Sequence, residues 1–195
     1  MNKAIESTEP ERFINHPVWF MLRGGIMFVL GSLLLIFTVL APNMSMLGVN
    51  ASWLPVSSAL ILVFGILRCF DAFASNSKTL FLMNIQGSII DAVCGFVILT
   101  NIQADAVVLS PLIAAYLFIQ GLFRIIITFS IETPNPKTIR IGGLISLLLG
   151  CMIWIDWPFS ALWFLSFALS AEITTRGWAL MFYARSVKKQ KVVSQ

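Results

Sequence analysis

The chain has 195 residues, of which 58% are apolar and 11% are charged, and its formal net charge is +4 at pH 7. An average soluble domain is about 45–50% apolar and about 25% charged, so this composition excludes an ordinary soluble domain and predicts an integral membrane protein. The surplus of basic residues arises mainly at the C-terminal end, and we therefore expect no nucleic acid partner.

Apolar runs fill most of the chain, each close to the roughly 20 residues that a membrane-crossing helix needs. The first run has no small-residue cleavage site after it, so we expect it to stay as a span. Residues 1–17 and the basic segment 186–195 remain as tails, and residues 18–185 form one transmembrane domain. The six predicted spans are residues 18–41, 53–74, 80–100, 106–130, 139–155 and 160–184.

The positions of the basic residues predict the orientation of these spans. If the chain crosses six times, all 13 lysines and arginines fall on the side of the N-terminus. Because Lys and Arg are retained on the cytoplasmic side, we expect both termini in the cytoplasm. The C-terminal VKKQKVVSQ would then contact anionic membrane lipid.

A regular spacing relates the second, fourth and sixth spans. Gly65, Gly121 and Gly177 are successively 56 residues apart, and Pro55 and Pro111 are separated by the same number. Each of these prolines stands ten residues before its glycine. The even-numbered spans therefore align without a gap, which indicates an internal repeat.

The first, third and fifth spans share another spacing, in which two small residues lie seven positions apart. Seven residues make about two helical turns, so both members of a pair lie on one face. Membrane helices use such faces for close approach. The predicted packing residues are Gly24, Gly31, Gly95, Gly143 and Gly150, with Ser88 as the partner of Gly95.

Together these spacings predict an all-α membrane protein built from three repeated helical hairpins, about 18–74, 80–130 and 139–184. Repeats that enter from the same side are related by an axis along the membrane normal. We therefore expect six transmembrane helices with pseudo-threefold symmetry and with the glycine faces directed inward.

Two arginines repeat with the hairpins, Arg68 and Arg124, each near the cytoplasmic end of its span. A long arginine side chain can extend from there to the lipid headgroups, so we predict both as charges at the inner interface. The third hairpin has Leu180 at the equivalent position and carries Arg176 instead.

Asp91, Glu172 and Arg176 lie deeper and are the candidate polar interior. A charge at mid-membrane costs at least about 2.5–3.5 kcal/mol on insertion scales, so these side chains should face protein. Two interpretations stay open: the charges neutralise one another as structural elements, or they form a proton site or polar pathway. Gln120, with Asn84 and Gln86, would extend such a pathway or bond helices together.

The order of the three hairpins resembles the HdeD-like family of bacterial multi-pass membrane proteins. The resemblance lies in odd spans opening like WFMLRGGIMFVLGSLLLIF and in even spans closing like LILVFGILRCFDAF and LFIQGLFRIIITF. It covers roughly residues 18–185 and implies a bacterial inner-membrane protein that contributes to acid-stress resistance. It supplies no catalytic residues, and the alternative function is a small transporter, channel or proton-linked device.

The sequence shows no motif that is typical of an enzyme active site. The only histidine is His16, just before the first span, so a buried serine or cysteine has no imidazole partner. Cys69, Cys94 and Cys151 lie in apolar runs and should pack as small hydrophobes. We expect no enzyme activity, catalytic residue, metal or cofactor, and the sequence leaves homo-oligomerisation open.

Overall fold

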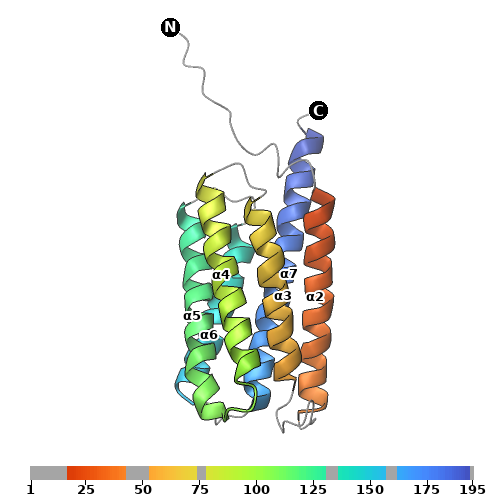
Figure 1. The fold of residues 1–195 in the computed structure, drawn as a ribbon. Coiled ribbons are helices and arrows are strands. Elements are labelled where there is room, and N and C mark those ends of the chain that lie inside the picture. Colours follow the sequence, from red (N-terminus) through yellow and green to blue (C-terminus); the bar gives the residue numbers. More distant parts are fainter. Residues whose placement is uncertain (1–16, 43–52, 74–77, 131–135, 157–161, 194–195) are drawn as a thin grey trace.

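The computed structural model describes residues 17–42, 53–73, 78–130, 136–156 and 162–193, and these residues contain six α-helices. The helices run up and down in turn, so that α2 begins and α7 ends at the same end of the bundle, here named the terminal end (Figure 1). The described part of the chain is therefore all-helical. The helices are α2 (Pro17–Leu40), α3 (Leu54–Phe73), α4 (Lys78–Thr100), α5 (Ala106–Ser130), α6 (Pro136–Trp154) and α7 (Leu162–Val193).

The helix boundaries lie within a few residues of the predicted spans except at the end of α7. Proline occupies the first position of both α2 and α6, where its missing N–H costs no hydrogen bond. α7 continues to Val193, so most of the segment predicted as a basic tail is helical. Lysine, arginine and glutamine are good helix formers, which explains this extension.

Within the described residues, four helices contain segments that are long and apolar enough to cross a bilayer. α4 contributes the shorter apolar stretch Asn84–Thr100. α7 differs because it carries buried polar side chains, among them Ser166, Ser170 and Glu172. The apolar helices indicate a membrane-embedded protein; the four segments are Met21–Leu40, Leu54–Phe73, Ala106–Phe129 and Pro136–Trp154.

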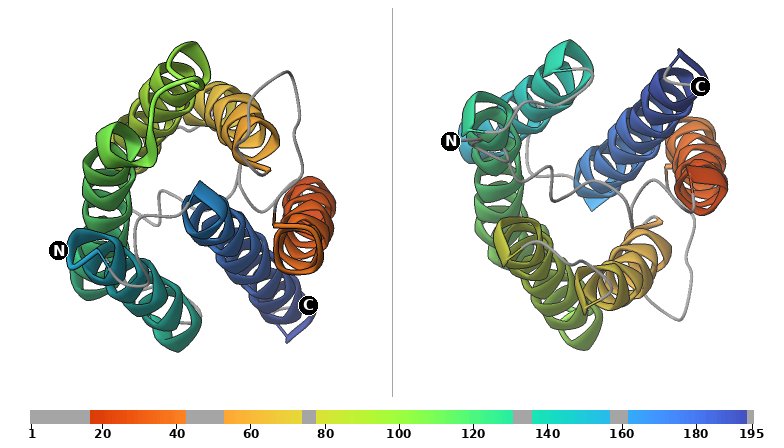
Figure 2. Two further views of the ribbon diagram at one scale, coloured as in Figure 1. Left: turned by 90° about the horizontal axis from the view of Figure 1, so that it is seen from below. Right: turned by 90° about the horizontal axis from the view of Figure 1, so that it is seen from above.

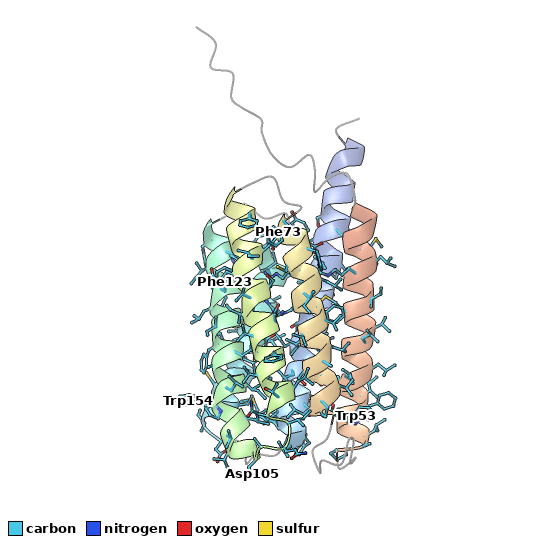
Figure 3. The ribbon with its side chains drawn as sticks, in the orientation of Figure 1. Trp53, Phe73, Asp105, Phe123 and Trp154 are labelled. Carbon is cyan, nitrogen blue, oxygen red and sulfur yellow. The ribbon has the colours of Figure 1, made fainter. Side chains whose placement is uncertain are left out.

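Large apolar side chains cover the outer surface of the helices, as the sticks in Figure 3 show. Leu22, Val29 and Val93 are each more than half exposed, a surface that suits lipid rather than water. Trp53 and Trp154 lie toward the end of the bundle that carries Asp105, opposite the terminal end (Figure 3). Aromatic residues at one level are typical of a membrane interface.

The end-on views show α3, α4, α5 and α6 arranged around the first turns of α7, which then runs out beside α2 (Figure 2). The most extensive helix contacts are those of α2 with α7, α3 with α4, and α5 with α6. Each of these pairs joins helices that belong to different predicted hairpins. The contacts thus lie between hairpins rather than within them.

Glycines allow these close contacts. A Cβ atom at Gly31 would lie 2.7 Å from the backbone nitrogen of Thr174, and one at Gly95 would lie 2.8 Å from that of Leu62. We expected the glycine faces to point at the bundle interior, but they point sideways at a neighbouring helix. The reason is that backbones approach closely only where a Cβ is missing. Gly24, Gly143 and Gly150 likewise meet a neighbouring helix.

The half of the bundle away from the terminal end holds a dense aliphatic core. Its side chains come from the beginnings of α3, α5 and α7 and from the end of α4, and they are almost completely buried. The polar side chains described next lie on the terminal side of this core. The core residues include Leu54, Ile61, Ile98, Leu109, Ile113, Leu165 and Leu169.

Candidate functional site

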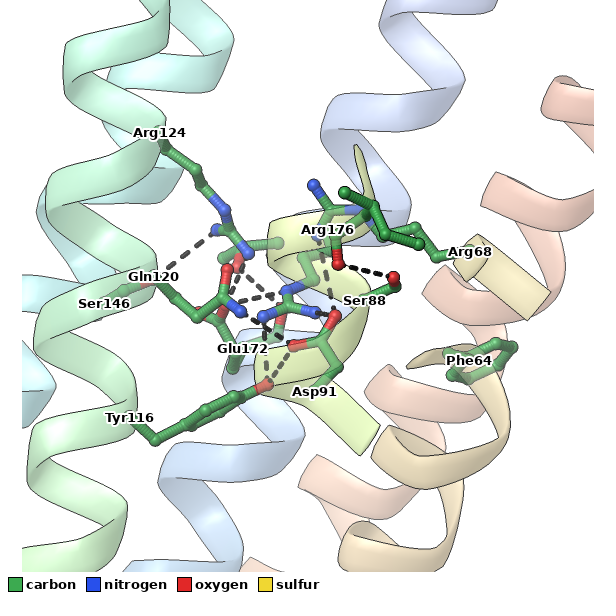
Figure 4. Close-up of polar contacts among 12 residues, drawn as sticks. Phe64, Arg68, Ser88, Asp91, Tyr116, Gln120, Arg124, Ser146, Glu172 and Arg176 are labelled. Carbon is green, nitrogen blue, oxygen red and sulfur yellow. Dashed lines mark hydrogen bonds and ion pairs between the residues drawn. The ribbon is translucent and has the colours of Figure 1, made fainter. Parts of the chain in front are cut away.

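Charged side chains from four helices meet inside the bundle, and a polar side chain of a fifth helix joins them (Figure 4). Salt bridges and hydrogen bonds connect them into one network, here named the ion cluster. The sequence predicted three of its members, Asp91, Glu172 and Arg176, as a polar interior and named Gln120 as a further candidate. The ion cluster consists of Arg68 of α3, Asp91 of α4, Tyr116, Gln120 and Arg124 of α5, Ser146 of α6, and Glu172 and Arg176 of α7.

Arg176 lies at the centre of the ion cluster and contacts both of its carboxylates. Its Nη1 lies 2.6 Å from Oδ2 of Asp91, and its Nε lies 2.8 Å from Oε1 of Glu172. Its Nη2 donates a hydrogen bond of 2.9 Å to the hydroxyl of Tyr116. The structure thus brings together the three predicted residues, with Arg176 as the bridge between the two acids.

Asp91 is 1% exposed, and both of its carboxylate oxygens have partners. Oδ1 accepts hydrogen bonds from Tyr116, at 3.0 Å, and from Gln120, at 2.8 Å. Oδ2 faces Arg176 and also Arg68, whose Nη1 lies 3.5 Å away. Asp91 therefore connects four helices, because its partners come from α3, α5 and α7.

Glu172 is equally buried, at 1% exposed, and its partners come from α5, α6 and its own helix. Arg124 and Arg176 both donate to Oε1, and the hydroxyl of Ser146 donates to Oε2. Ser146 also receives a weaker hydrogen bond of 3.4 Å from Nη1 of Arg124. Glu172 therefore links the last three helices of the chain.

Arg124 and Arg68 do not lie as the sequence predicted. We expected both side chains to extend toward lipid headgroups, but the guanidinium of Arg124 points inward to Glu172 and its side chain is 13% exposed. The Arg68 guanidinium approaches Asp91, and its side chain is 26% exposed. Both turn inward because buried carboxylates offer stronger partners in a low dielectric than the distant headgroups do.

Glycine makes room for the inward arginine of α3. A Cβ atom at Gly87 would lie 2.5 Å from Nη1 and 2.6 Å from Cζ of Arg68. The flat guanidinium therefore rests directly on the backbone of α4. Gly142 has the corresponding place on α6, where a Cβ atom would lie 3.4 Å from Nη1 of Arg124.

A second ion pair joins α2 to α3 beside the ion cluster. Nη1 of Arg23 binds the carboxylate of Asp71, and Nη2 donates a hydrogen bond of 3.1 Å to the carbonyl oxygen of Phe64. The side chains are 10% and 18% exposed. The sequence predicts Arg23 only as a cytoplasmic charge and does not indicate this pairing.

The repeat spacing points to Tyr116, a member of the ion cluster that the sequence prediction left out. Tyr116 and Glu172 are 56 residues apart, as are Gln120 and Arg176, and Arg68 and Arg124. Equivalent positions of two repeats thus both carry polar residues. Gln120, for which the sequence left open a polar pathway or a bond between helices, donates to Asp91 of α4, whereas Gln86 is exposed.

The chemistry of the ion cluster is that of charge pairing. Its carboxylates accept hydrogen bonds from arginine, tyrosine, glutamine and serine side chains of neighbouring helices, and a buried network of this kind holds helices in a fixed register. Among the described residues, no group of three or more His, Cys, Asp and Glu side chains is placed to hold a metal ion. Cys69, Cys94 and Cys151 carry free thiols, and His16 lies outside the described residues.

Comparison with known proteins gives one family match. Residues 86–155 match the model of a short repeat of unknown function, DUF308, a repeat typical of HdeD-like membrane proteins. The match begins within α4 and ends just after α6, so it includes Asp91, Tyr116, Gln120 and Ser146 but not Glu172 or Arg176. No curated protein and no solved structure matches the chain. The match and the apolar helices indicate a membrane protein in which residues 86–155 are similar to a DUF308 repeat.

Proposed function

We propose that this chain is a bacterial inner-membrane protein that contributes to acid-stress resistance without catalysis, and that its ion cluster is an acid-sensitive lock between helices. The observation that carries the proposal is the bridge from Asp91 through Arg176 to Glu172, buried inside apolar helices. The proposal agrees with the resemblance to HdeD-like proteins and with the DUF308 match.

The lock follows from the charges of the ion cluster. While both carboxylates are ionised, they hold arginines from α3, α5 and α7. Protonation of Asp91 would remove the charge that faces Arg68 and Arg176, and protonation of Glu172 would do the same for Arg124 and Arg176. Breaking one partner of a buried pair costs about 3–5 kcal/mol. Acidification would therefore loosen the contacts between these helices.

Survival of acid-stressed cells tests this role. Asp91→Asn keeps the shape of the side chain but removes its charge, so we expect cells that express it to lose protection at low pH. Asp105→Asn is the matched control, because it makes the same change at an exposed residue outside the ion cluster. Both variants are expressed at equal membrane levels. Full protection by Asp91→Asn would make the cluster purely structural.

We further propose six spans in a pseudo-threefold arrangement, with both termini in the cytoplasm. The support is that the described helices alternate in direction, and that Arg23, Arg68 and Arg124 all lie toward the terminal end. Single cysteines at Asn101 and Lys137, in a cysteine-free background, show on which side of the membrane each of these two residues lies. An impermeant reagent should label intact cells at residue 101 only, and labelling at residue 137 alone would reverse the orientation.

A second candidate function is a small transporter, channel or proton-linked device. Polar side chains continue from the ion cluster toward the beginning of α7, where the hydroxyls of Ser57 and Ser170 lie 3.1 Å apart in a buried contact. Ser166 lies one turn nearer the beginning of α7 than Ser170 and is also buried. Purified protein in liposomes decides between the candidates, since passage of protons or small solutes supports this one and an impermeable membrane supports the lock.

A further inference from the structure

The charges of the ion cluster do not balance. Arg68, Arg124 and Arg176 bring three positive charges, and Asp91 and Glu172 bring two negative ones, which leaves one positive charge in the cluster. A net charge in a low-dielectric interior costs several kcal/mol unless a partner neutralises it.

No other acid of the described residues supplies this partner. Asp71 is already paired with Arg23. Asp105 and Asp156 are exposed and lie beyond the aliphatic core, next to the beginning of α5 and the end of α6. The surplus charge therefore calls for a partner from outside the described part of the chain.

The surplus is greatest at Arg68. Its ion pair with Asp91 is 3.5 Å long, beyond the 2.7–3.2 Å range of ordinary N–H···O hydrogen bonds. The same carboxylate oxygen is 2.6 Å from Arg176, so Asp91 is bound mainly by the other arginine. The side chain of Arg68 is also about twice as exposed as that of Arg176, at 26% against 12%.

Two of the three guanidinium groups, those of Arg68 and Arg124, lie on the terminal-end side of the carboxylates, and that of Arg176 lies between the carboxylates. Figure 4 shows Arg124 and Arg68 above Asp91, toward the terminal end of the bundle, and Arg176 level with Asp91. The exposed fraction of the arginine side chains is between 12% and 26%, whereas that of both acidic side chains is 1%. A small molecule that comes from the terminal end would thus meet positive charge first.

We propose that the arginines of the ion cluster bind one small monocarboxylate, with Arg68 as its principal ligand. A single negative charge would neutralise the cluster, which argues for a monovalent anion rather than a divalent one. A carboxylate presents two oxygens in a plane, and the guanidinium fork binds that arrangement through two parallel hydrogen bonds. Gly87 permits the site, because any side chain there would displace the guanidinium of Arg68.

This inference goes beyond the proposed acid-sensitive lock and is tested separately from it. Binding is measured at neutral pH on purified protein, so a failure of the cell-survival experiment leaves the binding result unaffected. A failure to bind, in turn, leaves the ion pairs of the lock in place.

Isothermal titration with sodium acetate tests the proposal on the full chain in nanodiscs of neutral lipid. We expect saturable binding of one acetate per chain. Arg68→Gln should weaken it at least about tenfold, because it removes the charge-assisted hydrogen bonds. This variant also balances the charges of the ion cluster, so it should fold. Arg140→Gln is the control, since Arg140 is exposed outside the cluster, and it should bind acetate as the parent does.

Two further comparisons make the outcome decisive. Gly87→Ala should weaken acetate binding, whereas Gly142→Ala should have little effect, because its Cβ would stay 3.4 Å from Arg124. Repeating the titration in nanodiscs with anionic lipid should give the same affinity. The proposal is overturned if the parent does not bind acetate, if Arg68→Gln binds it equally well, if chloride binds as tightly, or if anionic lipid abolishes binding.

Discussion

The first hairpin, α2 and α3, differs from the other two in what it presents to the bundle interior. Two positions can be compared in α3, α5 and α7: the fifth residue and the first residue before the repeated glycine, which is Gly65, Gly121 or Gly177. The side chains at these two positions are apolar in α3, polar but uncharged in α5, and charged in α7. The same backbone positions therefore carry three different chemistries. These pairs are Leu60 and Phe64 in α3, Tyr116 and Gln120 in α5, and Glu172 and Arg176 in α7.

The contacts between hairpins, by contrast, repeat closely. A Cβ at Gly65 would meet Ala92, and one at Gly121 would meet Leu147. Both partners stand three residues before a glycine of the facing helix, Gly95 or Gly150. The comparison teaches that the glycines determine how the helices meet, and that the residues beside them are free to differ.

The contact between α2 and α7 follows the same register, but its arginine lies on the odd-numbered span, α2, instead of on the even-numbered one. Leu180 of α7 stands where α3 and α5 carry Arg68 and Arg124. Arg23 of α2 stands where α4 carries Gly87, eight residues before the packing glycine. The guanidinium thus comes from the opposite helix, and it pairs with Asp71 rather than with the ion cluster.

The largest predicted effect comes from Glu172→Gln. This change leaves Arg124 and Arg176 without a carboxylate at their shared contact, which should lower the free energy of unfolding by about 3–5 kcal/mol. Unfolding in mixed detergent micelles measures the loss. Leu60→Met is the control at the equivalent position of α3 and should cost less than about 1.5 kcal/mol. Equal losses would mean that the charged and apolar positions contribute alike.

Tyr116→Phe should have the next largest effect. It removes the hydroxyl that donates to Asp91 and accepts from Arg176, and hydrogen bonds to charged groups contribute about 1.5–3 kcal/mol. Tyr183→Phe deletes the same group outside the ion cluster and should change stability by no more than about 0.5 kcal/mol. The unfolding measurement used for Glu172→Gln compares the two. A larger loss for Tyr183→Phe would contradict the network described for Tyr116.

Alanine at the glycines tests the contact geometry. Gly31→Ala would place a Cβ against the backbone of Thr174, so we expect a loss of about 1–3 kcal/mol. Gly25 lies on the same helix with nothing within 4 Å of its Cβ position. Gly25→Ala should therefore gain about 0.5–1 kcal/mol from helix propensity. If both alanines destabilise equally, the contact of α2 with α7 is not as tight as described.

Most of the fold could be predicted from the sequence, whereas the site could be predicted only in part. Long apolar runs locate the helices. The predicted sixth span ends before α7 does, because the charged residues at the end of α7 resemble a tail. Asp91, Glu172 and Arg176 were recognised by their depth in the spans. The inward direction of Arg68 and Arg124 was not, because the choice between headgroup and interior depends on carboxylates from other helices.

The helix pairing also could not be predicted from the spacing of glycines alone. A pair such as Gly143 and Gly150 shows that one face of a helix is small, but it does not identify the helix that packs there. The partner depends on the closure of the whole bundle, in which α6 meets α5 and α2 meets α7.

A double-mutant cycle between Asp91 and Arg176 tests the central claim most directly. The stabilities of Asp91→Asn, Arg176→Gln and the double variant are compared with that of the parent in the same micelles. Because the two side chains are in contact at 2.6 Å within one network, we predict a coupling energy of about 2–3 kcal/mol, the upper part of the range for interacting pairs. Additive losses within about 0.5 kcal/mol would contradict the account, since distant sites behave in that way.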